Sequence, residues 1–190
     1  MEFQKELTIR VCKAEDLSAL REICEETSTI PCKTDAQRQF LRLVYCDPYV
    51  LTQTCHCFVA VNEADVPLGY ILCAPETRAF LRVFRRSFVP QIDRLGLHFG
   101  IQARASQTIH ALFGRKYSAH LHIDLSEKAR HLGTGTALMN ALKAHLSAIG
   151  IHSLFLSCDK RNENALRFYT RNGFESVVTL FGQKVLVCHF

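Results

Sequence analysis

The chain of 190 residues has no apolar run near the roughly 18 to 20 residues that a membrane-spanning helix requires. Residues 1–6 have none of the character of a secretory leader, and no repeat, linker or low-complexity tract is visible. These absences predict a soluble, cytoplasmic protein without a membrane partner. A length of 190 residues with 48% hydrophobic content is enough for one compact core, so we expect a single domain over residues 1–190.

A strong charge of either sign is also missing. The formal net charge is only +5 at pH 7, whereas a nucleic-acid binder would need a dense basic stripe with aromatic residues for stacking. We therefore expect no nucleic-acid partner, although a modest positive charge suits a ligand that carries phosphates.

The chain lacks C-x-x-C and any paired set of metal ligands. Its nine cysteines are odd in number and scattered singly through apolar stretches, which predicts reduced thiols rather than a disulfide scaffold. Cys55, His56 and Cys57 form the one cluster with metal-like chemistry, but no second pair of ligands accompanies it. We expect these three to be plain strand residues on alternating faces, and we expect no metal.

Alternating elements predict an α/β (α+β) fold. The first part of the chain has the pattern of a strand, two helices and a hairpin, over residues 7–12, 16–27, 34–47, 57–61 and 69–73. Asp16 and Thr34 are expected to cap the two helices, and the second is expected to end before Pro48.

Residues 75–118 are too many for a plain loop, and they predict a helical insertion. The spacing predicts a helix with an apolar side and a basic side. The apolar side has Phe80, Leu81, Phe84 and Phe88, and the basic side has Arg78, Arg82, Arg85 and Arg86. The basic side can be a solvated face, or it can wall an acceptor pocket or make a dimer contact.

The last third begins with a strand at residues 120–125 and a glycine-containing turn at residues 130–135. Gly133 and Gly135 leave no Cβ to obstruct a ligand, and the helix that follows to about residue 149 provides unpaired amides at its N-terminus. Such a turn binds a phosphate or pyrophosphate, although an ordinary strand-to-helix turn has the same glycines. A buried strand at 153–158, a short helix from Asn162 to Gly173 and a final hairpin at 175–190 complete the chain.

The order R-x-x-G-x-G, helix, strand, N-x-x-A-x-x-F-Y-x-x-x-G-F resembles the GNAT superfamily of acyl-CoA-dependent N-acyltransferases. The resemblance implies a mixed central sheet of about seven strands with flanking helices, and a V-shaped splay between the fourth and fifth strands. It also implies a helical insertion between the third and fourth strands. Residues 69–78 and 119–125 more narrowly resemble bacterial acetyltransferases similar to the acetyltransferase-like domain of O-GlcNAc hydrolases. Glu127 departs from the pattern, because many relatives carry a proline there.

In this superfamily the glycine loop holds the coenzyme A pyrophosphate, the strand before it pairs with the pantetheine amides, and the later Asn and Tyr lie beside the pantetheine and the thiol. The resemblance therefore implies acetyl-CoA as co-substrate. Asn162 can also serve only as a helix cap, and Phe168 is expected to pack. The implied cofactor-binding residues are Ile123, Asp124, Leu125, Arg130, His131, Leu132, Gly133, Thr134, Gly135, Thr136, Asn162, Ala165, Phe168 and Tyr169.

Acyl transfer needs a group that protonates the departing thiolate and, for a charged amine, a base. Tyr169 is the candidate acid, with a core tyrosine as the alternative. His120, His122 and Asp124 share one strand face by period-two spacing, and Asp124, then His122, are the preferred bases. Asp159 is a further candidate, and many members of the superfamily need no strong base.

Two functions from different classes remain open. The first is an acetyl-CoA-dependent N-acetyltransferase that transfers the acetyl group directly to an amine in a ternary complex, since the scattered cysteines show no nucleophile motif. The second is a noncatalytic acyl-CoA-binding or interaction module. Neither the acceptor nor the choice between monomer and homodimer follows from the sequence.

Overall fold

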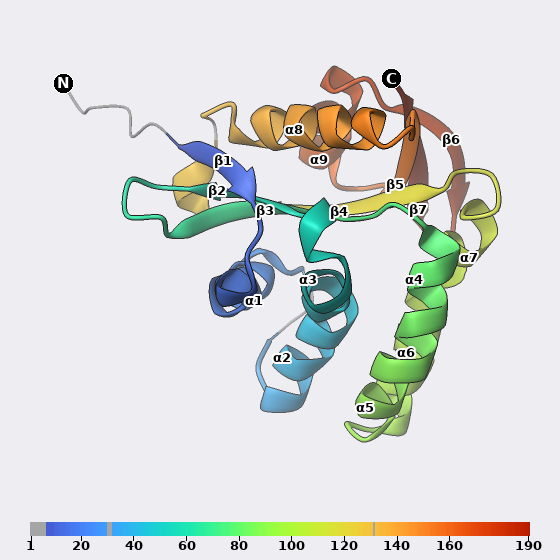
Figure 1. Cartoon of the computed structure of the whole chain (residues 1–190). Coiled ribbons are helices and arrows are strands. Elements are labelled where there is room, and N and C mark those ends of the chain that lie inside the picture. Colours follow the sequence, from blue (N-terminus) through green and yellow to red (C-terminus); the bar gives the residue numbers. More distant parts are fainter. Residues whose placement is uncertain (1–6, 30–31, 131) are drawn as a thin grey trace.

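Figure 1 shows the computed structural model, which describes residues 7–29, 32–130 and 132–190 as a central sheet with helices on both faces. None of the helices in these ranges is long and apolar enough to cross a bilayer. The strands are β1 (Thr8–Val11), β2 (Phe58–Val61), β3 (Pro67–Ala74), β4 (Ala119–Leu125), β5 (Ser153–Asp159), β6 (Glu175–Leu180) and β7 (Gln183–His189). The α-helices are α1 (Leu17–Thr27), α2 (Asp35–Leu41), α3 (Asp47–Gln53), α4 (Thr77–Val83), α5 (Val89–Asp93), α6 (Leu97–Ser106), α7 (Thr108–Phe113), α8 (Thr134–Ala148) and α9 (Glu163–Arg171).

The seven strands form one mixed sheet in the order β1-β2-β3-β4-β5-β7-β6. Only β4 and β5 run parallel, and α8 is the crossover that parallel pairing requires. These two strands pair at Ala119 with Leu154 and at His120 with Phe155, and nowhere further along. The rest of β4 and β5 diverges into a V-shaped gap. The predicted mixed sheet, its flanking helices and its splay between the fourth and fifth strands are therefore confirmed.

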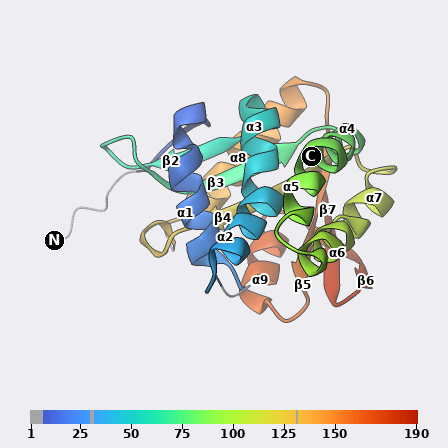
Figure 2. The ribbon, with the colours of Figure 1, turned by 90° about the horizontal axis from the view of Figure 1, so that it is seen from below.

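Each face of the sheet covers its own hydrophobic core. Helices α1 to α6 lie on one face, where Figure 2 shows them side by side, and α8 and α9 lie on the other (Figure 1). Alternate residues of β3 divide between the two cores: Tyr70 and Leu72 face the first, and Ile71 and Cys73 face the second. The β4 residues opposite Ala74, Leu72 and Tyr70 are His120, His122 and Asp124. These three candidates thus share the face covered by α1 to α6, as predicted.

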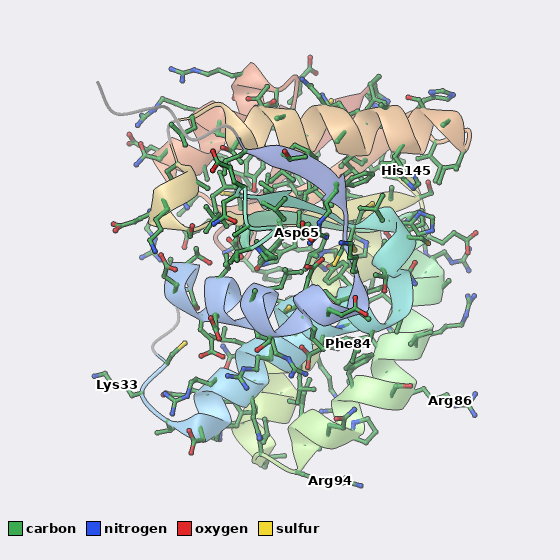
Figure 3. The ribbon with its side chains drawn as sticks, turned by 60° about the vertical axis from the view of Figure 1, so that its left-hand side comes forward. Lys33, Asp65, Phe84, Arg86, Arg94 and His145 are labelled. Atoms are coloured by element: carbon green, nitrogen blue, oxygen red, sulfur yellow. The ribbon has the colours of Figure 1, made fainter. Side chains whose placement is uncertain are left out.

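The segment between β3 and β4 is helical, as expected, and contains α4 to α7. The predicted apolar residues Phe80, Phe84 and Phe88 are buried in the first core, and the ring centroids of Phe80 and Phe84 lie 6.3 Å apart. Its arginines are exposed, and Figure 3 shows Arg86 extending away from the body of the protein. The basic side is a solvated face; its contact with an acceptor or a second subunit stays a prediction.

The prediction that a helix ends before Pro48 is wrong. The helical path continues from α2 through a π-helical segment, Arg42–Cys46, into α3, which contains Pro48. A second π-helical segment, Phe84–Phe88, likewise precedes Pro90 in α5. Proline lacks an N–H and clashes with the carbonyl four residues earlier, and the wider π turn relieves both problems without ending the helix.

Two other local predictions fail and one holds. Asp16 makes no capping hydrogen bond to α1; its buried carboxylate instead accepts bonds from Arg10, at 2.7 and 2.8 Å, and from the Lys13 amide, at 2.7 Å. Cys55 and His56 lie in a 3-10 turn, Thr54–His56, rather than in a strand. His56 Nδ1 lies 2.8 Å from Nε2 of His145, the α8 residue labelled in Figure 3. Thr34 does cap α2, accepting the Gln37 amide at 3.2 Å.

A buried network fixes the short parallel contact between β4 and β5. His120 is fully buried, and its Nδ1 lies 2.7 Å from the Thr77 hydroxyl, which itself donates to the Ser118 carbonyl at 2.7 Å. Nδ1 therefore donates to Thr77, and Nε2 accepts from the Tyr49 hydroxyl at 2.9 Å. Burial lowers the pKa of His120 well below 6.5, so its ring is neutral at physiological pH.

The Tyr49→Phe variant should lose about 1 to 3 kcal/mol of unfolding free energy, because it leaves the buried Nε2 of His120 without a donor. Urea denaturation measures the loss. Tyr45→Phe is the matched control on the same helical path, since no hydrogen bond of the Tyr45 hydroxyl is found in the described ranges. Equal losses in the two variants would contradict the network.

Candidate active site

The glycine turn lies at the open start of α8. Gly133 has φ +74°, a left-handed conformation that only glycine adopts without strain, and no atom lies within 4 Å of the position a Cβ would take. Leu132, Gly133 and Thr136 are exposed, whereas Thr134 is buried. The first amides of α8 have no partner within the helix, so they form the polar surface that an anion would contact. His131, also predicted to bind cofactor, lies outside the described residues.

The second glycine of the motif has a packing role that the sequence did not indicate. A Cβ on Gly135 would lie 2.9 Å from Cε2 of Phe168 and 3.4 Å from a methyl group of Leu125. The absence of a side chain at Gly135 therefore lets the aromatic ring of α9 contact the first turn of α8. Phe168 packs as expected, and the two sequence motifs are in direct contact.

The inner edge of β4 faces the gap. The Ser126 amide, just after β4, donates to the Leu68 carbonyl of β3 at 2.9 Å. Because backbone groups of an antiparallel pair alternate between the two sides of a strand, the amides and carbonyls of Ile123 and Leu125 point away from β3, toward the gap. An extended ligand with amide groups can pair with such an edge.

Arg130 reaches back to this edge. Its Nε donates to the Leu125 carbonyl at 3.1 Å, and its side chain is exposed beside the glycine turn. By the same alternation the backbone of Asp124 faces β3, so only its side chain is free to approach the gap.

The second motif forms α9. Asn162 caps this helix, because its Oδ1 accepts the Ala165 amide at 3.1 Å; its predicted contact with the ligand remains a prediction. Tyr169 is 9% exposed, with its ring 5.3 Å from that of Phe168 and 5.6 Å from that of Phe174. In the described part of the chain its hydroxyl has no hydrogen-bond partner.

Burial raises the pKa of the Tyr169 phenol, with smaller contributions from Cys158 and from the Asp124 carboxylate. The phenol is therefore protonated at neutral pH and can donate a proton.

Asp124 and His122 form a close polar pair. Tyr70, opposite Asp124 in the β3–β4 register, donates its hydroxyl to Asp124 Oδ2 at 2.6 Å, and His122 Nε2 lies 3.0 Å from the same oxygen. Burial alone would lower the pKa of His122, but the Asp124 charge outweighs it and, with a hydrogen bond to Cys24, raises that pKa to about 10. His122 is thus an imidazolium at neutral pH, and the pair can accept a proton only through the carboxylate.

The two lower-ranked bases are poorly placed. His120 is enclosed in its network with Thr77 and Tyr49. Asp159 is held by Arg161 through bonds of 3.1 Å from Nε and 2.8 Å from a terminal nitrogen, and these bonds lower its pKa to about 2. Neither side chain is free to take a proton from an acceptor.

Sequence reasoning missed Tyr70 and Cys24. Tyr70 reaches Asp124 through strand register, which becomes visible only when the β3 hairpin and β4 are aligned. Cys24 comes from α1, about a hundred residues before His122, and one ligand atom of each lies within 4.8 Å of the other and of Asp124. No local pattern in the sequence marks either residue.

A model of the acetyltransferase (GNAT) family matches residues 17–174, and the chain belongs to this family. A crystal structure of SsHAT has the same fold at 22% identity, with a TM-score of 0.87 over 97% of this chain and 98% of that one. PaiA N-acetyltransferase from Thermoplasma acidophilum, in complex with coenzyme A, is 16% identical with a TM-score of 0.64 over 97% and 99% of the two chains. An agmatine N-acetyltransferase mutant is 15% identical with a TM-score of 0.68 over the same shares, 97% and 99%. The narrower resemblance to the relatives of O-GlcNAc hydrolases is not confirmed by these matches.

The His122–Asp124 pair should be visible in a pH titration of the His122 ring by NMR. We expect a pKa near 10 in the native protein and a pKa below 6.5 in Asp124→Asn, because burial then acts without the neighbouring charge. Asp159→Asn, a carboxylate removed elsewhere, should leave the His122 pKa in place.

The pH dependence of the unfolding free energy tests the His122–Asp124 pair independently. Since folding raises the pKa of His122 above 6.5, the pair contributes its full stability below pH 6.5, and that contribution is lost as the pH rises toward about 10. A native protein whose His122 titrates near 6.5 would show that the pair does not form.

Proposed function

We propose that this protein is an acetyl-CoA-dependent N-acetyltransferase that transfers the acetyl group directly to an amine in a ternary complex. The observation that carries the proposal is that β4 and β5 diverge after two residue pairs. This divergence leaves a gap between the free edge of β4 and α9. The glycine turn borders this gap beyond the end of β4, and Tyr169 comes from α9. Membership of the GNAT family and a fold shared with a coenzyme A-bound N-acetyltransferase support it.

In this proposal acetyl-CoA lies along the gap. Its pyrophosphate contacts the first amides of α8, with Arg130 beside it and the residues from His131 to Thr136 around it. The pantetheine amides pair with the backbone of Ile123 and Leu125, and Asn162, Ala165 and Phe168 border the arm from α9. Binding moves Arg130 from the Leu125 carbonyl to the phosphates, which carry the stronger negative charge.

The acetyl group then lies between the two predicted catalytic groups. After the amine nitrogen attacks the thioester carbonyl, the carbon–sulfur bond breaks and Tyr169, which is protonated at neutral pH, donates its proton to the departing thiolate. The second proton lost by the amine nitrogen restores the phenol. The Asp124 carboxylate attracts the protonated amine, orients it and accepts its proton, while Tyr70 and the His122 imidazolium hold the carboxylate in position. The transfer needs no metal in this scheme.

The acceptor approaches from the side covered by α1, α2 and α3, because Asp124 faces those helices. A small amine fits the carboxylate at this position, and the names of two structural neighbours, PaiA N-acetyltransferase and agmatine N-acetyltransferase, agree with an amine. We further propose that the chain works in the cytoplasm as one domain, either as a monomer or as a homodimer.

One observation favours the alternative of a noncatalytic acyl-CoA-binding module. Asp124 already accepts a hydrogen bond from Tyr70 and pairs with His122, so its Oδ2 is occupied before an acceptor amine arrives. Both alternatives require the cofactor, and they differ only in turnover.

Thermal unfolding with acetyl-CoA tests the shared claim, and thiol release across an amine panel tests catalysis. Acetyl-CoA at 100 times its dissociation constant should stabilise the protein by about 2.7 kcal/mol. Release of free coenzyme A should depend on the amine. Stabilisation without release for any amine would favour the binding module, and no stabilisation would refute both.

Tyr169→Phe should lower kcat by about 100-fold or more while changing the KM for acetyl-CoA little, because the lost proton matters only when the thiolate departs. Steady-state kinetics at saturating amine measure both constants. Tyr117→Phe, which removes a hydroxyl from a similarly buried tyrosine in a separate cluster, is the control. An unchanged kcat in Tyr169→Phe would refute the acid role.

A further inference from the structure

Three side chains from two distant segments converge beside the gap. Cys24 projects from α1, and His122 and Asp124 project from alternate positions of β4 toward that helix. One donor atom from each lies within 4.8 Å of the other two. These donors are a sulfur, an imidazole nitrogen and a carboxylate oxygen, which is the mixed set that Zn²⁺ binds in proteins.

The geometry between His122 and Asp124 also suits a shared ion. Nε2 lies 3.0 Å from Asp124 Oδ2, yet it is a buried nitrogen that has no well-directed hydrogen bond within the described ranges. Ligand atoms bound to one tetrahedral zinc at ordinary bond lengths lie roughly 3 to 3.5 Å apart and aim at the metal rather than at each other. Nε2 is thus placed to bind an ion through its lone pair once its proton has left.

The surroundings supply the other requirements of a metal site. Tyr70 donates to Asp124 Oδ2 and so fixes the carboxylate, as groups behind a metal ligand do. Cys24 is 3% exposed and forms the inner wall, whereas the side chains of His122 and Asp124 are 29% and 21% exposed. The partial exposure of His122 and Asp124 leaves the cluster a route to solvent.

We propose that Cys24, His122 and Asp124 form a binding site for a divalent cation of the zinc class, with a fourth position open to the gap. The thiolate excludes Mg²⁺ and Ca²⁺, which take oxygen ligands. On binding, the Cys24 thiol and the His122 imidazolium each release a proton to solvent, and the metal bonds form at the freed lone pairs.

An ion at this site occupies the carboxylate to which we assign the acceptor amine. Zinc therefore inhibits acetyl transfer by competing with the amine rather than with acetyl-CoA. This consequence rests on the proposed function, whereas binding of the ion does not, so a failure of either can be recognised separately.

Binding is tested with Co²⁺, which replaces Zn²⁺ and gives an absorbance band when a thiolate is bound to it. The full-length protein, stripped with a chelator, should bind one Co²⁺ per chain with this band, and Zn²⁺ should displace it. In Cys24→Ala the band should disappear, and the affinity for Zn²⁺, measured by competition with a chromophoric chelator, should fall more than about tenfold. Tyr70→Phe should keep the band and weaken Zn²⁺ binding by roughly 10- to 100-fold.

Two controls separate the site from other thiols. Cys73→Ala removes a thiol buried in the core on the opposite face of the sheet, and Cys55→Ala removes the exposed one. Both should leave the band and the affinity unchanged, and urea unfolding confirms that each variant is folded. If Cys24→Ala unfolds, Asp124→Asn replaces it, with the same expected loss of affinity.

The proposal is overturned if folded protein binds Co²⁺ without a thiolate band, or if Cys24→Ala and Asp124→Asn bind Zn²⁺ as the native chain does. Kinetics then test the consequence. Zn²⁺ should raise the KM for the amine and leave the KM for acetyl-CoA unchanged. Inhibition that instead competes with acetyl-CoA would refute the assignment of the amine to Asp124, even if the ion binds as proposed.

Discussion

Strands β4 and β5 share a sheet but pair over only two residues, and the candidate site depends on this separation. A strand edge in the middle of a sheet leaves amides and carbonyls unpaired, and unpaired backbone groups are costly unless water, a side chain or a ligand satisfies them. Arg130 satisfies one of these groups, at Leu125. The edge at Ile123 faces the gap, where a peptide-like ligand can complete the ladder.

Buried polar groups on the sheet face covered by α1 to α6 stabilise the short contact between β4 and β5. His120 lies at the last shared pair and joins the start of the insertion, through Thr77, to α3, through Tyr49. Two residues further along the same strand face, His122 is charged rather than neutral, because the Asp124 carboxylate is beside it. One strand face thus changes from a neutral, fully satisfied interior to an ionic cluster at the gap.

The elements that rely on local signals were predictable. The glycine turn before α8, the Asn162 cap and the hairpin of β2 and β3 all depend on residues a few positions apart. The helix through Pro48 was not, because a π turn placed just before the proline absorbs a defect that normally ends a helix. No local sequence pattern predicts such a π turn.

The residues of the candidate site likewise separate into those predicted from local motifs and those that depend on the tertiary fold. Arg130, Gly133 and Tyr169 were predicted from two motifs through their resemblance to the GNAT superfamily. Cys24 and Tyr70 were missed because their contacts with His122 and Asp124 form only when the tertiary fold brings α1 and β3 to β4. The packing role of Gly135 was missed for the same reason, since it needs the position of Phe168.

The close packing of Phe168 on Gly135 joins the residues that the proposed function assigns to the two ends of the cofactor. Gly135 belongs to the turn of α8 that would hold the pyrophosphate, and Phe168 immediately precedes Tyr169 in α9. The start of α8 and the phenol of α9 are therefore separated by one packed aromatic ring. In the proposed function, the residues assigned to the phosphate end and to the acid thus belong to one packed interface, so a larger side chain at position 135 would disturb both.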